Sequence, residues 1–165
     1  MMRSLKLSIL ALSALTLSAC GFTPMHQTGA TGTSLQDVAV VIDKTSDVSD
    51  NEAGFYIAQR LRDRIGTTGS TYTLTIEPSY GRSPLGITDS DIASRYDVRV
   101  GAKYVLRDTK TGDRLDRGTV SGITTFGAAS GPYGIITADD IGTEQASKDV
   151  ADKLIIALAK YFADN

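Results

Sequence analysis

Three basic residues stand at regular spacing in the middle of the chain: Arg95, Arg99 and Lys103. Apolar and polar residues alternate around them, so in a strand they would share one face of a sheet, with successive Cα atoms about 13 Å apart. Arginine grips a phosphate or carboxylate through two N–H groups, and lysine adds a point charge. The spacing predicts a cationic stripe that binds a ligand with several anionic groups. One alternative is a solvated strand face whose charges serve only solubility. The other is a face that contacts a protein partner.

The only cysteine, Cys20, ends an N-terminal segment that is typical of a targeting signal. Residues 1–6 carry two basic residues and no acid, and residues 7–17 form an uncharged apolar run too short to span a bilayer permanently. The sequence Leu17-Ser18-Ala19-Cys20 is similar to the lipobox of bacterial lipoproteins, in which the cysteine thiol accepts diacylglycerol. We expect cleavage after residue 19 and lipidation of Cys20, which anchors stably when two or more acyl chains are attached. The alternative is an ordinary secretory signal with a chance cysteine at its end.

Cleavage would leave 146 of the 165 residues and change the formal charge from −2 to −4, because the signal carries Arg3, Lys6 and no acid. Small polar residues fill 28–34 and indicate a flexible tether. We therefore expect a signal peptide over 1–19, a lipidated N-terminus and tether over 20–34, and one folded domain over 35–165. The acidic balance gives no attraction to nucleic acid.

The residue counts exclude several kinds of site. One cysteine and one histidine form neither an internal disulfide nor a four-ligand zinc site, and His26 falls in the predicted tether. The sequence has no Ser/His/Asp or Cys/His arrangement, no phosphate-cradling glycine loop and no cluster of metal ligands. We expect a protein that is not an enzyme and that uses no cofactor and no metal.

The pattern of the folded part predicts four strands and two helices in the order β-α-β-β-β-α. The first helix is expected to begin at a capping box of Ser49 and Glu52, to bury Phe55 and to end at Gly66. The last helix is expected to be capped by Thr137 and to run to the C-terminus with a stripe of Ala146, Val150, Ala151, Leu154, Ala157, Leu158 and Tyr161. The strands are expected over 35–42, 71–77, 91–107 and 114–126, with Pro78 ending the second of them.

Alternating strands need one covered face, and the two amphipathic helices provide it. The pattern therefore predicts an α+β two-layer sandwich, with both helices on one face of a four-stranded mixed sheet and the first two strands parallel. A turn over 108–113 joins the third and fourth strands, and Gly112 is free there to adopt a positive φ. The fourth strand has no cleanly apolar face, which indicates a bulge or an edge position.

Two segments rich in glycine and proline, 78–90 and 127–136, are expected to be loops. Exposed apolar residues in loops can mark a contact surface for a partner, although packing beneath the sheet explains them nearly as well. The apolar residues of these segments are Tyr80, Leu85, Ile87, Tyr133, Ile135 and Ile136.

Four short motifs occur in order along the chain: Cys20-Gly21-Phe22-Thr23-Pro24-Met25, Ala93-Ser94-Arg95-Tyr96, Leu106-Arg107-Asp108 and Ser130-Gly131-Pro132-Tyr133. The sequence around them resembles the LptE (RlpB-type) lipopolysaccharide-assembly lipoproteins, in their alphaproteobacterial form. One departure is Ala138-Asp139-Asp140-Ile141-Gly142, where the family has an alanine-rich helix start.

This resemblance implies a binding role. LptE-type lipoproteins have two helices on a four-stranded sheet, associate with the β-barrel LptD, and assist the delivery of lipopolysaccharide to the cell surface. Gly21 after the lipidated cysteine implies the outer membrane, on its periplasmic side, by similarity to enterobacterial sorting. The expected ligand of Arg95, Arg99 and Lys103 is then lipopolysaccharide. The competing class is a structural accessory lipoprotein of another envelope complex, for secretion or efflux.

Overall fold

The protein is described by a computed structural model that covers residues 34–66, 69–87, 93–127 and 131–165. Cys20, the signal segment and nearly all of the tether lie outside these residues. A helical turn at 34–36 precedes the main elements. These are β1 (Val38–Ile42), α3 (Val48–Ile65), β2 (Tyr72–Ile87), β3 (Ala93–Asp108), β4 (Arg114–Gly127) and α4 (Pro132–Asp164).

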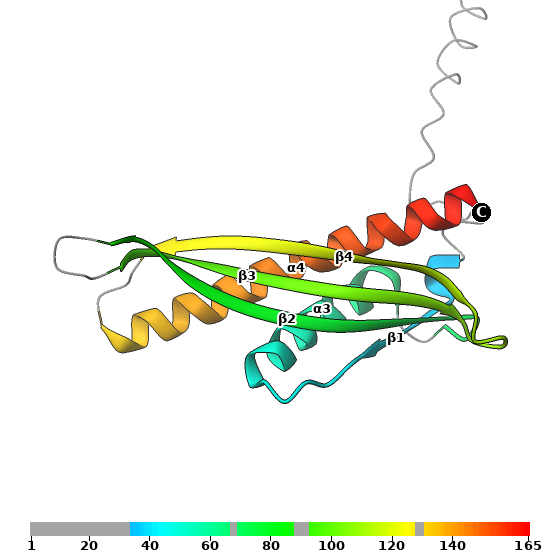
Figure 1. The fold of residues 1–165 in the computed structure, drawn as a ribbon, viewed down its shortest axis with the longest axis horizontal. Helices are drawn as coiled ribbons and strands as arrows, with labels where there is room; N and C mark the ends of the chain where they lie inside the picture. The colour runs from blue at the N-terminus through cyan, green and yellow to red at the C-terminus, as the bar shows by residue number, and fades with distance from the viewer. Residues whose placement is uncertain (1–33, 67–68, 88–92, 128–130) are drawn as a thin grey trace, which may run out of the picture.

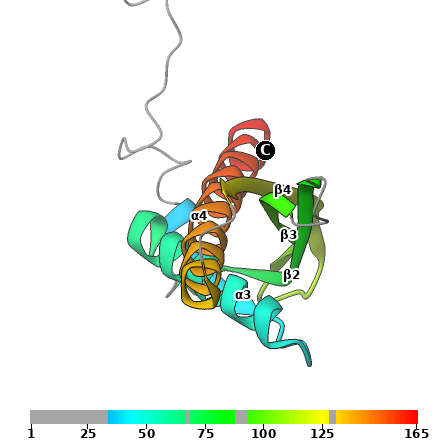
Figure 2. The same ribbon diagram turned by 90° about the vertical axis from the view of Figure 1, so that its left-hand side faces the viewer.

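The sheet has the order β1-β2-β3-β4, with β1 parallel to β2 and the other pairs antiparallel. Both helices cover one face, and α4 runs along the whole length of β3 and β4 (Figures 1 and 2). The predicted α+β sandwich with a mixed sheet is therefore confirmed. The turn at 108–113 has Gly112 at φ 76°, and the register shifts between Leu106 and Arg107, where β4 pairs as an edge strand.

The core lies between the sheet and the two helices. The even-numbered residues of β3 from Val98 to Leu106 point into it, as the alternation predicts. The buried apolar side chains of α4 are Ala146, Val150, Ala151, Leu154, Ile155 and Leu158, so most of the predicted stripe is correct. No helix in the described ranges combines the length and the apolar character needed to cross a membrane.

The first helix differs from the prediction in its cap and in its buried face. Asp47 caps α3 by accepting a hydrogen bond from the Ser49 N–H at 2.8 Å, so the capping box of Ser49 and Glu52 was wrong. Aspartate accepts this bond well because its side chain is short and charged at the positive end of the helix. The helix buries Ala53, Gly54, Ile57, Leu61 and Ile65, whereas Phe55 is 62% exposed. Gly66 ends α3 at φ 72°, as predicted.

The first strand is shorter than predicted, and the second is longer. Residues 34–36 form a helical turn, so β1 begins only at Val38. Strand β2 continues through Pro78 to Ile87, and the predicted loop over 78–90 was wrong as far as 87. The even-numbered N–H groups of β2 face β1, as the bond from Tyr72 N–H to the Asp37 carbonyl shows. Because β1 pairs only as far as Ile76, β2 has no partner strand on that side at Pro78 and Pro84, and the N–H groups that these prolines lack interrupt no ladder.

The last helix begins five residues before Thr137, so the predicted cap and the loop over 127–136 were wrong beyond residue 131. Helix α4 begins at Pro132, after Gly131 at φ 90°. Proline fits the first turn of a helix because its fixed φ is helical and the N–H it lacks has no intrahelical partner there. Tyr133, Ile135 and Ile136 are therefore helical residues.

Candidate functional site

The uncovered face of the sheet places Arg95, Arg99 and Lys103 in one row along the central strand β3. Each residue lies between defined neighbours: Lys103 between Glu77 and Thr119, Arg99 between Gly81 and Ile123, and Arg95 between Leu85 and Gly127. All three basic side chains are exposed. We call this row the cationic stripe. The strand alternation that predicts it also fills the opposite face of β3 with core residues, which fixes which way the stripe points.

Only one member of the cationic stripe is engaged by an acid among the described residues. Lys103 Nζ lies 3.2 Å from Glu77 Oε1, and both side chains are more than half exposed. Asp97, on the same face, accepts a hydrogen bond from the Thr125 hydroxyl. Arg95 and Arg99 make no ion pair within the part of the chain that the structure describes. Two guanidinium groups are therefore available to a ligand.

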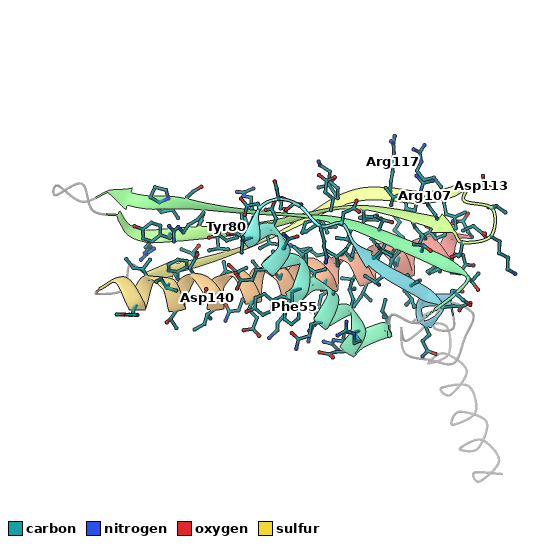
Figure 3. All side chains as sticks on the ribbon, turned by 90° about the horizontal axis from the view of Figure 1, so that it is seen from below. Phe55, Tyr80, Arg107, Asp113, Arg117 and Asp140 are labelled. Atoms are coloured by element: carbon teal, nitrogen blue, oxygen red, sulfur yellow. The ribbon has the colours of Figure 1, made fainter. Side chains whose placement is uncertain are left out.

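The open face carries two more cations that the sequence analysis did not single out. Arg107 continues the four-residue spacing of the cationic stripe, and Arg117 enters from β4 through its pairing with Val105. Both side chains point away from the helices (Figure 3). The spacing from Lys103 could have revealed Arg107, whereas Arg117 needed the strand register. Glu77 and Asp97 are the acids of β2 and β3 that share this face with the five basic residues.

Apolar side chains border these cations. Ile123 beside Arg99 is 49% exposed, and Leu85 beside Arg95 is 40% exposed. A surface that combines guanidinium groups with exposed aliphatic side chains suits an amphiphile whose anionic and hydrocarbon parts lie close together.

The residues predicted to contact a partner separate into several environments. Tyr133 and Ile136, at the start of α4, are 85% and 58% exposed, and Leu85 lies on the open face. Ile135 is half-buried. Tyr80 packs beneath the sheet, which was the alternative reading. Ile87 is the last residue of β2, and its side chain lies outside the described part.

Tyr80 belongs to a polar cluster between the sheet and α4. Its hydroxyl donates to the carboxylate of Asp139, with the two oxygens at 2.8 and 2.9 Å, and Arg82 Nη1 lies 3.5 Å from Asp139 Oδ2. Burial, and after it the bond to Asp139, raises the pKa of the Tyr80 hydroxyl well above its usual range. The phenol thus remains protonated and acts as a donor. This arrangement joins β2 to α4.

Among the described residues, no group of three or more histidine, cysteine or acidic side chains is placed to hold a metal ion. The open face with its cationic stripe is therefore the candidate site, and the chemistry it offers is the binding of anionic groups.

Comparison with known proteins was made at the levels of sequence and of structure. No protein-family model matches the chain, and no curated protein matches it. A lipoprotein from Caulobacter crescentus superposes with a TM-score of 0.62 and 23% identity, over 82% of this chain and 97% of that one. Rare lipoprotein B from Shewanella oneidensis superposes with a TM-score of 0.57 and 10% identity, over 77% of this chain and 96% of the other. The chain has the rare lipoprotein B fold.

A third structure with the rare lipoprotein B fold is lipoprotein B from Nitrosomonas europaea, at a TM-score of 0.52 and 10% identity, over 87% of this chain and 93% of that one. The RlpB-type architecture expected from the sequence motifs is thereby confirmed at the level of fold. All three carry the word lipoprotein in their names.

Proposed function

We propose that this chain is a lipid-anchored lipoprotein of the outer membrane that assists the assembly of lipopolysaccharide at the cell surface, on the periplasmic side and without catalysing a reaction. The observation that carries the proposal is an uncovered basic sheet face on a rare lipoprotein B fold. The lipobox at Cys20 supplies the anchor. In this role the β-barrel LptD is the protein partner.

Lipopolysaccharide fits the chemistry of the open face. It carries phosphates and carboxylates on a sugar scaffold next to a hydrocarbon part. Arg95 and Arg99 have no acidic partner in the described residues, and their Cα atoms are separated by about 13 Å along the strand. Each guanidinium can take an oxyanion through two N–H groups, while Ile123 and Leu85 provide aliphatic contacts. Lys103 adds a third charge once the ligand displaces Glu77.

Contact with the barrel is assigned to the end of the molecule where α4 begins. Tyr133 and Ile136 are large, apolar and exposed there, and an exposed tyrosine is a frequent anchor in protein interfaces. Leu85 lies on the β2 segment that extends toward the same end (Figure 1). Leu85 also borders Arg95 and is shared with the cationic stripe, whereas Tyr133 and Ile136 lie on α4, so substitutions of these two residues test partner binding independently of ligand binding.

Binding of labelled lipopolysaccharide to the mature chain tests the role of the stripe. The double substitution Arg95→Gln and Arg99→Gln removes two phosphate contacts, and we expect affinity to fall by about tenfold or more. The matched control is Arg62→Gln with Arg64→Gln, which removes the same charge from exposed positions of α3 on the covered side. Equal affinity of both variants, with intact folds, would remove the stripe from the proposal.

Partner choice is tested by co-purification and depletion. We expect the solubilised lipoprotein to co-purify with a large β-barrel, and its depletion to reduce lipopolysaccharide at the cell surface. Normal surface lipopolysaccharide after depletion would favour the competing role as an accessory of a secretion or efflux complex.

A further inference from the structure

The sheet has strand backbone without a neighbouring strand in two places. One is the outer side of β4, the last strand in the order β1-β2-β3-β4 (Figure 1). The other is the part of β2 beyond Ile76, where the pairing with β1 ends. The N–H and C=O groups of an unpaired strand bind another strand readily, so proteins usually block such edges. The two edges of this sheet are blocked in different ways.

The edge of β2 is blocked along most of its length. The even-numbered residues of β2 direct their N–H and C=O groups toward this side. Pro78 and Pro84 have no N–H, and the Tyr80 N–H donates to Asp50 Oδ1 at 2.7 Å. Three of the four even-numbered residues from 78 to 84 therefore offer no free N–H to an added strand.

The outer edge of β4 carries the backbone groups of its odd-numbered residues from Arg117 onward. Odd-numbered residues of β2 and β3 pair with each other, so the even-numbered residues of β3 face β4. These pair with even-numbered residues of β4, as Val100 does with Gly122. The N–H and C=O groups of the odd-numbered residues consequently point outward. No proline lies between Arg117 and Gly127.

The same part of β4 has no charged side chain. Residues 118–127 read GTVSGITTFG, in which threonine, valine, isoleucine and phenylalanine alternate with small residues. The residues whose backbone groups point outward are exposed: Thr119, Ser121, Ile123 and Thr125. High β-propensity, little charge and the lack of proline are typical of segments that pair with another chain.

One charged side chain from α4 reaches this edge. Lys153 Nζ donates to the Ser121 carbonyl at 2.7 Å and lies 2.7 Å from Asp149 Oδ2, which holds it in place. Within the described ranges, this is the only hydrogen bond to an outward-facing backbone group of 118–127. An added strand must either displace the ammonium group from the carbonyl or bury it beside the new pair of strands, and both cost free energy.

We propose that the β4 edge is a latent pairing surface for a second copy of this chain, and that Lys153 keeps it closed. The edge is compatible with itself, because antiparallel pairing about Ser121 would place Arg117 opposite Thr125 of the other copy, so that no like charges face each other. The same pairing would need the Ser121 carbonyl that Lys153 occupies. This inference does not depend on the ligand or the partner of the proposed function.

Sedimentation equilibrium of the full mature chain in a density-matched detergent measures its self-association. Lys153→Met removes the ammonium group and keeps an unbranched side chain. We expect this variant to associate at least about tenfold more tightly than the unsubstituted chain, because a charge-assisted hydrogen bond no longer opposes pairing. Lys153→Arg keeps the charge and the donor and should not associate.

Lys148→Met is the matched control for the loss of charge. Lys148 forms the same kind of ion pair, with Glu144 four residues earlier at 2.6 Å, and makes no hydrogen bond to β4 among the described residues. This variant should behave as the unsubstituted chain.

A proline on the outward side shows whether the association uses this edge. Thr119→Pro removes an outward N–H that the ladder between β3 and β4 does not use, as the natural prolines of β2 do on its unpaired side. Added to Lys153→Met, it should return the association to that of the unsubstituted chain. Amide exchange gives a second readout: in Lys153→Met, the amides of Ser121 and Ile123 should exchange more slowly at high than at low protein concentration.

Three results would overturn the proposal. Equal association of Lys153→Met and Lys148→Met would show that the association follows net charge. Association that persists with Thr119→Pro in a folded chain, or amide protection confined to other elements, would place the contact on another surface. A Lys153→Met chain that associates no more than the unsubstituted chain would show that Lys153 does not block the β4 edge.

Discussion

The two halves of this molecule are stabilised in different ways. In the half that contains β1 and α3, two helices cover the sheet, and Ile57, Leu61 and Leu154 are fully buried. In the half where α4 begins, α4 alone lies under the extended ends of β2, β3 and β4 (Figure 1). We call these the two-helix half and the one-helix half.

In the one-helix half a polar and aromatic cluster stands where a second helix would pack. The Asp139 carboxylate accepts a hydrogen bond from the Tyr80 hydroxyl and forms an ion pair with Arg82. The Arg82 guanidinium carbon lies 5.5 Å from the centre of the Tyr96 ring. The Tyr96 and Phe126 rings stack with their centres 5.7 Å apart. Gly142 allows α4 to approach, since a Cβ atom there would lie 3.3 Å from Phe126. The contrast indicates that the first half carries most of the folding stability, while the second holds its shape through a few specific contacts.

The largest effect is expected from a cavity in the two-helix half. Leu61→Ala removes a fully buried side chain between α3 and the sheet and should lower the free energy of unfolding by about 3 kcal/mol. Denaturant titration measures the loss. Hydrogen exchange should become faster in both halves, because the whole domain unfolds more readily. Faster exchange in α3 alone would contradict this division of stability.

A smaller loss is expected where α4 touches the sheet most closely. A Cβ atom on Gly122 would lie 2.5 Å from the Ala146 carbonyl oxygen, which is backbone and has little room to move. Gly122→Ala should therefore shift α4 and cost about 2 kcal/mol, measured by thermal unfolding. Gly127→Ala is the control, because nothing lies within 4 Å of a Cβ atom there. Equal stability of the two variants would show that α4 adjusts freely.

Tyr80→Phe isolates the cluster of the one-helix half. The substitution removes the hydrogen bonds to Asp139 but keeps the ring, so we expect a loss of about 1.5 kcal/mol. Hydrogen exchange should become faster in β2 beyond Pro78 and in the first turns of α4, and stay unchanged in α3 and β1. A uniform increase across the chain would mean that both halves unfold as one unit and that the comparison is wrong.

The smallest effect is expected at the ion pair between the helices. Arg60 binds Asp152 through two contacts of 3.0 and 2.8 Å and holds the pKa of this carboxyl below its usual value of 3.8. The stabilisation by this ion pair is therefore complete above the pKa that Asp152 has in the unfolded chain. It is lost as the pH falls through the lower pKa that Asp152 has in the folded protein. Because Asp152 is 41% exposed, its contribution should be about 0.5 kcal/mol. Asp152→Asn should remove the part of the pH dependence of the unfolding free energy that comes from this pair. Unfolding measured at pH 7 and at a pH below the folded pKa of Asp152 checks this expectation.

Sequence patterns predicted the regular parts of the fold well. The alternation in β3 placed the core on its even side and the cationic stripe on its odd side because both follow from one strand period. The predictions were wrong at Pro78, where a strand continues, and at Pro132, where a helix begins. A proline ends a strand or helix only where the N–H that it lacks would have made a hydrogen bond within that element. At Pro78 β2 no longer has β1 as its neighbour, because β1 is short and pairs only as far as Ile76.

Residue spacing in the sequence predicted only those site residues that lie on one strand. Arg95, Arg99 and Lys103 belong to one strand, so their common face followed from their numbers. Arg117 joins them through the β3–β4 register, which shifts at Leu106, and Tyr80 found a partner 59 residues away in Asp139. Contacts of this kind depend on how elements pack and have no signature in the local sequence.

Photo-cross-linking in cells tests the central claim most directly. A photoreactive amino acid replaces Ile123, which is 49% exposed beside Arg99 on the open face, or Ile156, which is 60% exposed on α4. The account predicts an adduct with lipopolysaccharide from position 123 and not from position 156, and loss of the adduct when Arg95 and Arg99 are changed to glutamine. No adduct from position 123, or equal adducts from both positions, would contradict the claim that the open face binds lipopolysaccharide.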